Sequence, residues 1–152
     1  MAVLEFACGW QHFALPLAYV HRVLHSARPV PLPGAPDIVL GVLNVGGDTV
    51  TVLDFGLRAG CAPTVLIPAQ QFILCDIGGF ACALVVDSIV GTTVLAQPMA
   101  GWPEAAAGAD FIAGVIHLPD GLCLMIDPAR FLFAHEQEQL TQALTGAADA
   151  QR

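Results

Sequence analysis

The sequence contains no lysine, and arginine supplies all five of its permanently basic side chains. Surfaces that bind nucleic acid need clustered basic residues to neutralise phosphates, whereas the formal net charge of this chain is −8. We therefore expect no nucleic-acid partner. The missing lysine also excludes the P-loop motif G-x-x-x-x-G-K-[ST], in which lysine contacts the phosphates of a nucleotide.

Charged residues of both signs are scarce. They make up 12% of the chain, against about 25% in a typical globular protein, while hydrophobic residues make up 56%. The sequence has no run of roughly 20 apolar residues that could span a membrane, and its N-terminus carries Glu5 instead of the basic segment of a signal peptide. We expect a cytoplasmic protein without membrane insertion, whose apolar surface is partly covered by partners, self-association included.

Cysteine pairs with the C-x-x-C spacing are absent, and the five cysteines are an odd number. Most of them lie in apolar runs such as "FILCDI" and "FACALVV", where cysteine packs as a small hydrophobic residue. We expect free thiols in a reducing compartment.

Short apolar runs separated by glycine and proline dominate the first 130 residues, which favours small barrels or a sandwich over a βαβ fold. The Pro-rich segment 27–36 should be an extended surface loop, because proline interrupts helices and central strands. The predicted strands are 3–8, 12–16, 20–25, 41–45, 49–53, 65–67, 72–77, 80–86, 89–95, 112–118 and 122–126.

The C-terminal region is the one long stretch typical of a helix. In "DPARFLFAHEQEQLTQAL" we expect Asp127 as the N-cap and Pro128 at the first helical position, and we expect residues 145–152 to fray. The residues predicted to share one face are Phe131, Leu132, His135 and Leu140 or Leu144.

The segments "GVLNVGGDTVTVLD" (41–54) and "GVIHLPDGLCLMID" (114–127) align without a gap. Each has a glycine, a strand, a turn, a second strand and an aspartate, which indicates two similar β-units. Gly46 and Gly47 of the first copy are replaced by a Pro-Asp-Gly turn in the second, so both segments are predicted to be hairpins and not phosphate-binding loops.

Asp54 and Asp127 end the two copies and could be a pair of catalytic carboxylates. Because each aspartate recurs together with its turn, we favour the alternative that both cap the following turn. Asp87 should likewise end a strand. His21 and His25 would share a helix face as metal ligands, but their β-branched neighbours favour a strand. Neither serine lies in G-x-S-x-G. We thus expect a binding module with no catalytic residue, metal or cofactor.

The segments "FALPLAYVHRVL", "PVPLPGAPDIVLGVLNVGGDTVTVLD", "ALVVDSIVGTTVL" and "FIAGVIHLPDGLCLMIDPARFLF" resemble the CheW family of chemotaxis coupling proteins over residues 2–133. The resemblance implies an all-β fold of two SH3-like five-stranded barrels side by side, with short helices. We expect one CheW-like domain in residues 1–134. Its first barrel would span roughly 12–66 and its second roughly 67–127, with the terminal segments packing across them; residues 135–152 would hold the helix end and tail.

The resemblance also implies a role: such adaptors couple the cytoplasmic tips of chemoreceptors to the regulatory domain of a CheA-type histidine kinase, at membrane-associated receptor arrays. A receptor helix would lie in the groove between the barrels, as an amphipathic helix does in an apolar groove. The groove positions that the resemblance implies are Val20, Arg22, Val23, Gly41, Gly46 and Ile89.

Two positions depart from the family pattern. The family usually has N-L-R-G where this chain has Asn44-Val45-Gly46-Gly47, and an acid where it has Arg22. The departures fit a receptor or kinase with altered charges, a type IV pilus chemosensory system, or an adaptor that has lost receptor binding. Arg22 could instead be an ordinary solvated strand residue. The alternative function is a module that binds a small ligand or another protein in the groove between the barrels.

Overall fold

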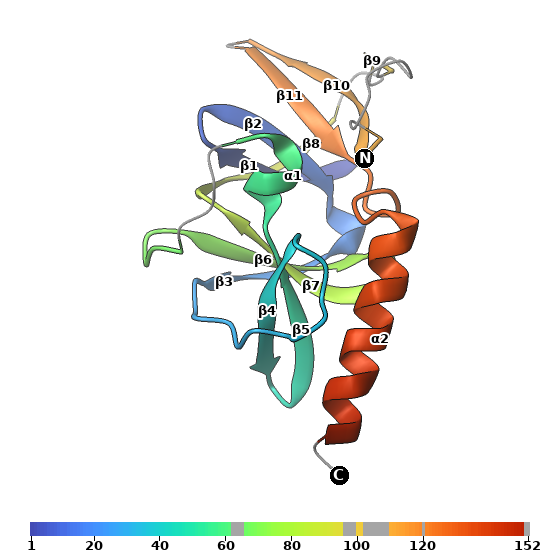
Figure 1. Cartoon of the computed structure of the whole chain (residues 1–152). Helices are drawn as coiled ribbons and strands as arrows, with labels where there is room; N and C mark the ends of the chain where they lie inside the picture. Colours follow the sequence, from blue (N-terminus) through green and yellow to red (C-terminus); the bar gives the residue numbers. More distant parts are fainter. Residues whose placement is uncertain (62–65, 96–99, 102–109, 120, 151–152) are drawn as a thin grey trace.

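The computed structural model describes residues 1–61, 66–95, 100–101, 110–119 and 121–150, and it contains two β-sheets and a long C-terminal helix (Figure 1). Sheet A has the strand order β8-β1-β2-β11-β10-β9, and sheet B has the order β3-β6-β7-β5-β4. Sheet A is five longer strands plus the two-residue β9. In Figure 1, α2 runs down one side of the molecule, past strands of sheet B.

The strands of sheet A are β8 (Ser88–Val94), β1 (Ala2–Cys8), β2 (Gln11–Pro16), β11 (Gly121–Ile126), β10 (Ile112–Leu118) and β9 (Ala100–Gly101). The strands of sheet B are β3 (Val20–His25), β6 (Gln71–Ile77), β7 (Phe80–Val86), β5 (Asp48–Leu53) and β4 (Val39–Val45). The helical elements are the 3₁₀ turn η1 (Leu17–Tyr19), α1 (Phe55–Ala59) and α2 (Ala134–Ala150).

The internal repeat predicted from the sequence is present as two equivalent hairpins. Hairpin β4–β5 joins sheet B through a parallel pairing of β5 with β7, and hairpin β10–β11 joins sheet A through a parallel pairing of β11 with β2. Both hairpins have a register shift just before the first glycine of the repeat, Gly41 in one and Gly114 in the other. In both, the N–H of the final aspartate donates to the carbonyl of the residue before the hairpin, over 2.8 Å and 2.7 Å.

The two sheets do not follow one another along the chain. Sheet B takes the continuous segment 20–86, whereas sheet A combines the N-terminal strands with strands from 88–126. A boundary near residue 66 therefore does not separate the sheets, because β3, β4 and β5 of sheet B precede it and β6 and β7 of the same sheet follow it. The N-terminal strands β1 and β2 pair with β8 and β11 of sheet A.

The main hydrophobic core contains buried side chains from both sheets. Phe55 lies at its centre, with ring centroids 5.1 Å from Phe6, 4.8 Å from Phe13 and 5.8 Å from Phe131. All four rings are buried. Such offset and edge-to-face contacts add to the stabilisation from apolar burial, so the first residue of α1 connects the sheets at the middle of the molecule.

The prediction that Asp54 is a cap is confirmed, because its Oδ1 accepts the N–H of Leu57 in α1 over 3.1 Å. Asp127 was predicted to be the N-cap of the C-terminal helix, and this prediction is wrong. Its Oδ1 accepts the N–H of Ala129 over 3.0 Å, closing a turn, and α2 begins only at Ala134. The intervening backbone turns because Phe131 is buried in the core before the helix starts.

The remaining differences concern α2 and one strand. His135 is exposed whereas Leu140 is fully buried, and residues 145–150 are helical and not frayed. The predicted strand 65–67 begins outside the described residues. Residues 66 and 67 are not in a strand: the N–H of Gln70 donates to the carbonyl of Ile67 over 3.1 Å and closes a turn. The other predicted strands are present, and β9 and η1 had not been predicted.

Candidate partner-binding surface

Strand β3 forms an exposed edge of sheet B. It pairs with β6, and no other described strand pairs with its second side. The register shifts between Val20 and Arg22; bulges of this kind often redirect side chains at sheet edges. Val20 is half-buried against the main core, Arg22 is exposed, and 36% of Val23 is exposed. Three of the residues predicted to bind partners thus lie together on an accessible edge.

Strand β3 carries an exposed positive charge although the net charge of the chain is negative, and the carboxylate of Asp76 on β6 lies 3.1 Å from Nε2 of His21 on β3. Arg22 is exposed on β3, Arg28 is exposed in the segment that follows, and neither has an ion pair among the described residues. Arg58 pairs instead with Glu136, and Arg130 lies 3.7 Å from Asp127. The arginines without an ion pair among the described residues are therefore Arg22 on β3 and Arg28 in the segment that follows it.

Ile89 of β8 lies close to one end of β3. Its N–H donates to Oε1 of Gln71 over 3.0 Å, and Gln71 is the residue of β6 that pairs with His25. Ile89 is half-buried against the main core, as Val20 is. The start of β8 in sheet A and the edge strand of sheet B are thus joined through the first residue of β6.

Gly46 lies at the tip of hairpin β4–β5, far along the strand order from β3. Gly46 and Gly47 have φ values of 59° and 94°, as a two-residue turn with two positive φ angles requires, and the N–H of Gly47 donates to Oδ1 of Asn44 over 2.9 Å. The hairpin prediction is confirmed, and no side chain projects from this tip.

Gly41 is buried, so it does not contribute to an accessible surface. Its φ is 153°, and a Cβ atom at this position would lie 2.4 Å from the carbonyl oxygen of Val30. Val30 and Val42 exchange backbone hydrogen bonds of 2.9 Å and 2.8 Å that attach the Pro-rich segment to β4. Glycine is needed here for the close approach of two backbones.

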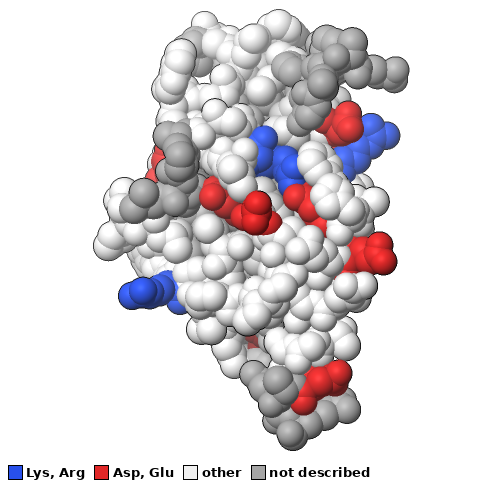
Figure 2. Space-filling view, viewed as in Figure 1, with Lys and Arg blue, Asp and Glu red and all other residues white. Residues whose placement is uncertain are grey.

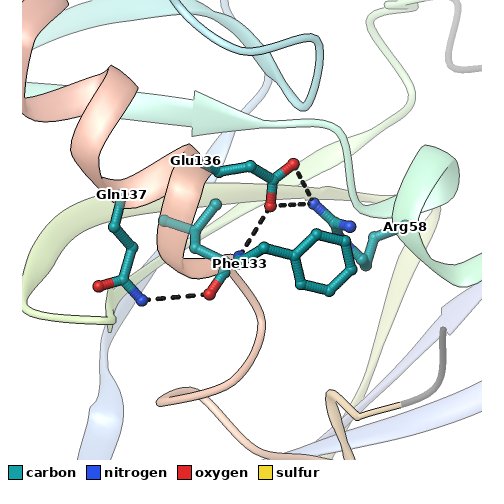
Figure 3. A network of polar contacts seen from close by, with 5 residues as sticks. Arg58, Phe133, Glu136 and Gln137 are labelled. Atoms are coloured by element: carbon teal, nitrogen blue, oxygen red, sulfur yellow. Dashed lines mark hydrogen bonds and ion pairs between the residues drawn. The ribbon is translucent and has the colours of Figure 1, made fainter.

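One polar cluster, shown in Figure 3, was not predicted from the sequence. Nη2 of Arg58 lies 2.5 Å from both carboxylate oxygens of Glu136, and each side chain is only 10% exposed. The guanidinium stacks 3.8 Å from the ring centroid of Phe133, whose N–H donates to Glu136 over 2.8 Å. This cluster attaches the first turn of α2 to α1. The signal that could have found it is a glutamate three residues into a helix, a position that accepts the N–H of the N-cap residue.

Cys75, Cys82 and Cys123 have no reactive environment. Burial raises the pKa of the Cys82 and Cys123 thiols to about 12 and raises that of Cys75 well above its usual value, whereas a nucleophilic cysteine needs a lowered pKa. In the described parts of the chain, no group of three or more His, Cys, Asp and Glu residues is placed to hold a metal ion. No described helix is both long and apolar enough to cross a membrane.

Large areas of the face in Figure 2 carry no charged atoms. The molecule thus combines a largely uncharged face, two β-sheets and an exposed strand edge that bears the unpaired Arg22. These features define a β-rich module suited to binding other proteins. The chain belongs to the CheW-like domain family, whose model matches residues 2–136. The predicted role, a non-enzymatic scaffold that couples receptors to a CheA-type kinase, is the role of this family, and the prediction is confirmed.

Relatives and a solved structure agree with this assignment. The chain is 23% identical over 139 residues to the "Chemotaxis protein CheW" of Rhizobium meliloti (strain 1021), covering 90% of both chains. It is 21% identical to the "Probable chemotaxis protein CheW" of Rhizobium etli, covering 82% of this chain and 83% of the relative. The fold matches the scaffolding protein TtCheW from Thermoanaerobacter tengcongensis with a TM-score of 0.79 at 18% identity, over 89% and 94% of the two chains. The predicted fold of two SH3-like subdomains is thereby confirmed.

Proposed function

We propose that this chain binds the cytoplasmic tip of a chemoreceptor along β3 and the start of β8, and that it also binds the regulatory domain of a CheA-type kinase. Family membership supports both partners. The geometry supports the surface: Val20 and Ile89 are half-buried against the main core at opposite ends of β3, while Arg22 and Val23 are accessible on the strand between them. The complex assembles at cytoplasmic receptor arrays.

The unpaired Arg22 on β3 carries this proposal and indicates the chemistry of the receptor. On a chain of net charge −8, Arg22 is an exposed positive charge on a strand edge that can pair with an acidic side chain of a partner. Complementary charges across an interface set specificity and orientation. The receptor segment opposite β3 therefore carries an acidic side chain, in a flagellar or a type IV pilus system.

Charge reversal at Arg22 tests the receptor interface. We expect Arg22→Glu to weaken binding to the cognate receptor tip by about tenfold, because it replaces an attractive pair by a repulsive one. Calorimetry against the isolated receptor tip measures the affinity. Arg130→Glu makes the same change of charge at an exposed arginine outside this surface, and it should leave the affinity unchanged. Equal affinities of the wild type and Arg22→Glu would remove Arg22 from the site.

The kinase interface is tested separately. A folded sample should bind the isolated CheA-type regulatory domain with and without the Arg22→Glu change, since the proposal places Arg22 at the receptor. Absence of binding by the folded wild-type protein would refute the coupling role. If the wild type bound the kinase domain and Arg22→Glu did not, β3 would belong to the kinase interface and not to the receptor interface.

A second candidate function is the binding of a small apolar ligand. A cavity of about 490 Å³ lies between η1 and the ends of β10 and β11, within the size range of ligand pockets. Its lining is mostly apolar, with Tyr19 and Asp127 as polar groups. A ligand-dependent rise in melting temperature across a metabolite panel would support this function, and a flat response across the panel would exclude it for the compounds tested.

A further inference from the structure

Two of the five cysteines lie against each other although 53 positions separate them in the chain. Cys8 ends β1 of sheet A, and Cys61 follows Gly60, the residue that ends α1. The thiol of Cys61 donates to the carbonyl oxygen of Cys8 over 3.4 Å, and the Cys61 side chain is close enough to raise the pKa of the Cys8 thiol.

The backbone holds both cysteines in place. Gly60 has φ 75° and turns the chain out of α1, and the N–H of Cys61 donates to the carbonyl of Gly56 over 2.9 Å. Next to Cys8, the N–H of Gly9 donates to Oδ2 of Asp87 over 2.6 Å. Hydrogen-bonded turns therefore fix the backbone next to both cysteines and hold the Cys61 thiol against Cys8.

The pair differs in accessibility from the other cysteines. Cys61 is half-buried, so a small oxidant can reach it, whereas Cys8 is buried behind it. Cys75 and Cys82 pair directly across strands β6 and β7 but are fully buried, and Cys123 is buried in a separate cluster. Cys8 and Cys61 are therefore the pair that combines close contact with a thiol that an oxidant can reach.

We propose that Cys8 and Cys61 are a thiol-modification site at which a hydroperoxide forms a reversible disulfide between the end of β1 and the segment that follows α1. The Cys61 thiolate attacks the peroxide, the O–O bond breaks, and Cys61 becomes a sulfenic acid with release of water or an alcohol. The Cys8 sulfur then attacks the Cys61 sulfur, the S–O bond breaks, and the hydroxide leaves as water with the proton from Cys8. Two thiols are oxidised and one peroxide is reduced; a thiol reductant reverses the change.

The second step should depend on pH. Burial and the neighbouring Cys61 raise the pKa of the Cys8 thiol well above its usual value, and only the thiolate attacks. The rate of disulfide closure after sulfenic acid formation should therefore keep rising with pH above 9, without levelling at the titration of an ordinary cysteine.

The experiment uses the full chain, treated with hydrogen peroxide, followed by blocking of free thiols and mass spectrometry with peptide mapping. We expect one intramolecular bond, Cys8 to Cys61, in most molecules, and a melting temperature that rises by about 5–10 °C and falls back with dithiothreitol. Cys61→Ser should abolish both effects. Cys123→Ser is the matched control and should retain both.

Three outcomes would overturn the proposal. They are oxidation of Cys61 to the sulfinic acid without a bond to Cys8, a bond between Cys61 residues of two molecules, and a peroxide effect on melting temperature that persists in Cys61→Ser. Because Cys61 is half-buried, its serine variant should fold, and circular dichroism of the reduced protein checks this.

Discussion

At the scale of single residues, two glycines of the same strand and its turn have different physical roles. Gly41 is buried where two backbones meet, whereas Gly46 is exposed at a hairpin tip. The sequence repeat predicts the hairpin and its turn at Gly46, because turn chemistry is local. It does not predict that Gly41 touches Val30, since that contact depends on how the Pro-rich segment folds back onto β4.

Alanine substitution separates these roles. Gly41→Ala should lower the free energy of unfolding by about 2–4 kcal/mol, because its Cβ would clash with the Val30 carbonyl oxygen. Gly46→Ala should cost only about 1 kcal/mol: its φ of 59° is strained for alanine, but no atom lies within 4 Å of the new Cβ. Urea unfolding measures both. Similar losses for the two variants would contradict the assigned role of Gly41.

At the scale of elements, the attachment of α2 was the least predictable part of the fold. The pattern Asp-Pro before an apolar run indicates a helix start at Asp127, but Phe131 and Leu132 are buried in the core first. The helix starts at Ala134, where Glu136 accepts the N–H of Phe133 and binds Arg58. The position of Glu136 as a capping glutamate is a local signal, but its ion pair with Arg58, 78 positions away, leaves none.

Breaking the Arg58–Glu136 pair should destabilise the protein strongly. Both side chains are 10% exposed, so Glu136→Gln leaves a buried cation without its counter-charge, and we expect a loss of about 3–5 kcal/mol. The double variant Arg58→Met, Glu136→Gln should recover part of that loss, because no buried charge remains. Chemical denaturation of both single variants and the double variant gives the coupling energy.

The exposed pair Arg130–Asp127 provides the control for this cycle. Arg130 is 69% exposed and Asp127 is 31% exposed, and such surface pairs contribute about 0–1 kcal/mol. Arg130→Gln should therefore be close to neutral. A coupling energy for Arg58 and Glu136 as small as that of this pair would show that the cluster does not hold α2 in place.

At the scale of the whole molecule, the sequence was sufficient for the fold class and the family, while the partner surface needed the structure. Strand pattern and the repeat depend on neighbouring residues, which is why most predicted strands are present. Arg22 and Ile89 both lie next to β6, and this depends on the order of the strands in the sheets. Gly41 is buried because Val30 of the Pro-rich segment packs against it. Position in a motif does not distinguish an accessible residue from a packed one.

Alkaline pH should destabilise the whole molecule through its buried thiols. The pKa of Cys82 and of Cys123 is about 12 in the folded protein, against 9.0 for the unperturbed group, chiefly because burial disfavours the thiolate. Above pH 9 the unfolded chain has lost these protons and the folded chain has not, so the free energy of unfolding falls as pH rises. Between pH 8 and pH 10 each thiol contributes a loss of about 1.4 kcal/mol, and Cys75 adds a loss of the same sign. Unfolding curves under reducing conditions should show it, and Cys123→Ala should reduce the loss by about one thiol's share. A free energy of unfolding that stays constant from pH 8 to pH 10 would mean that these cysteines are not buried in solution.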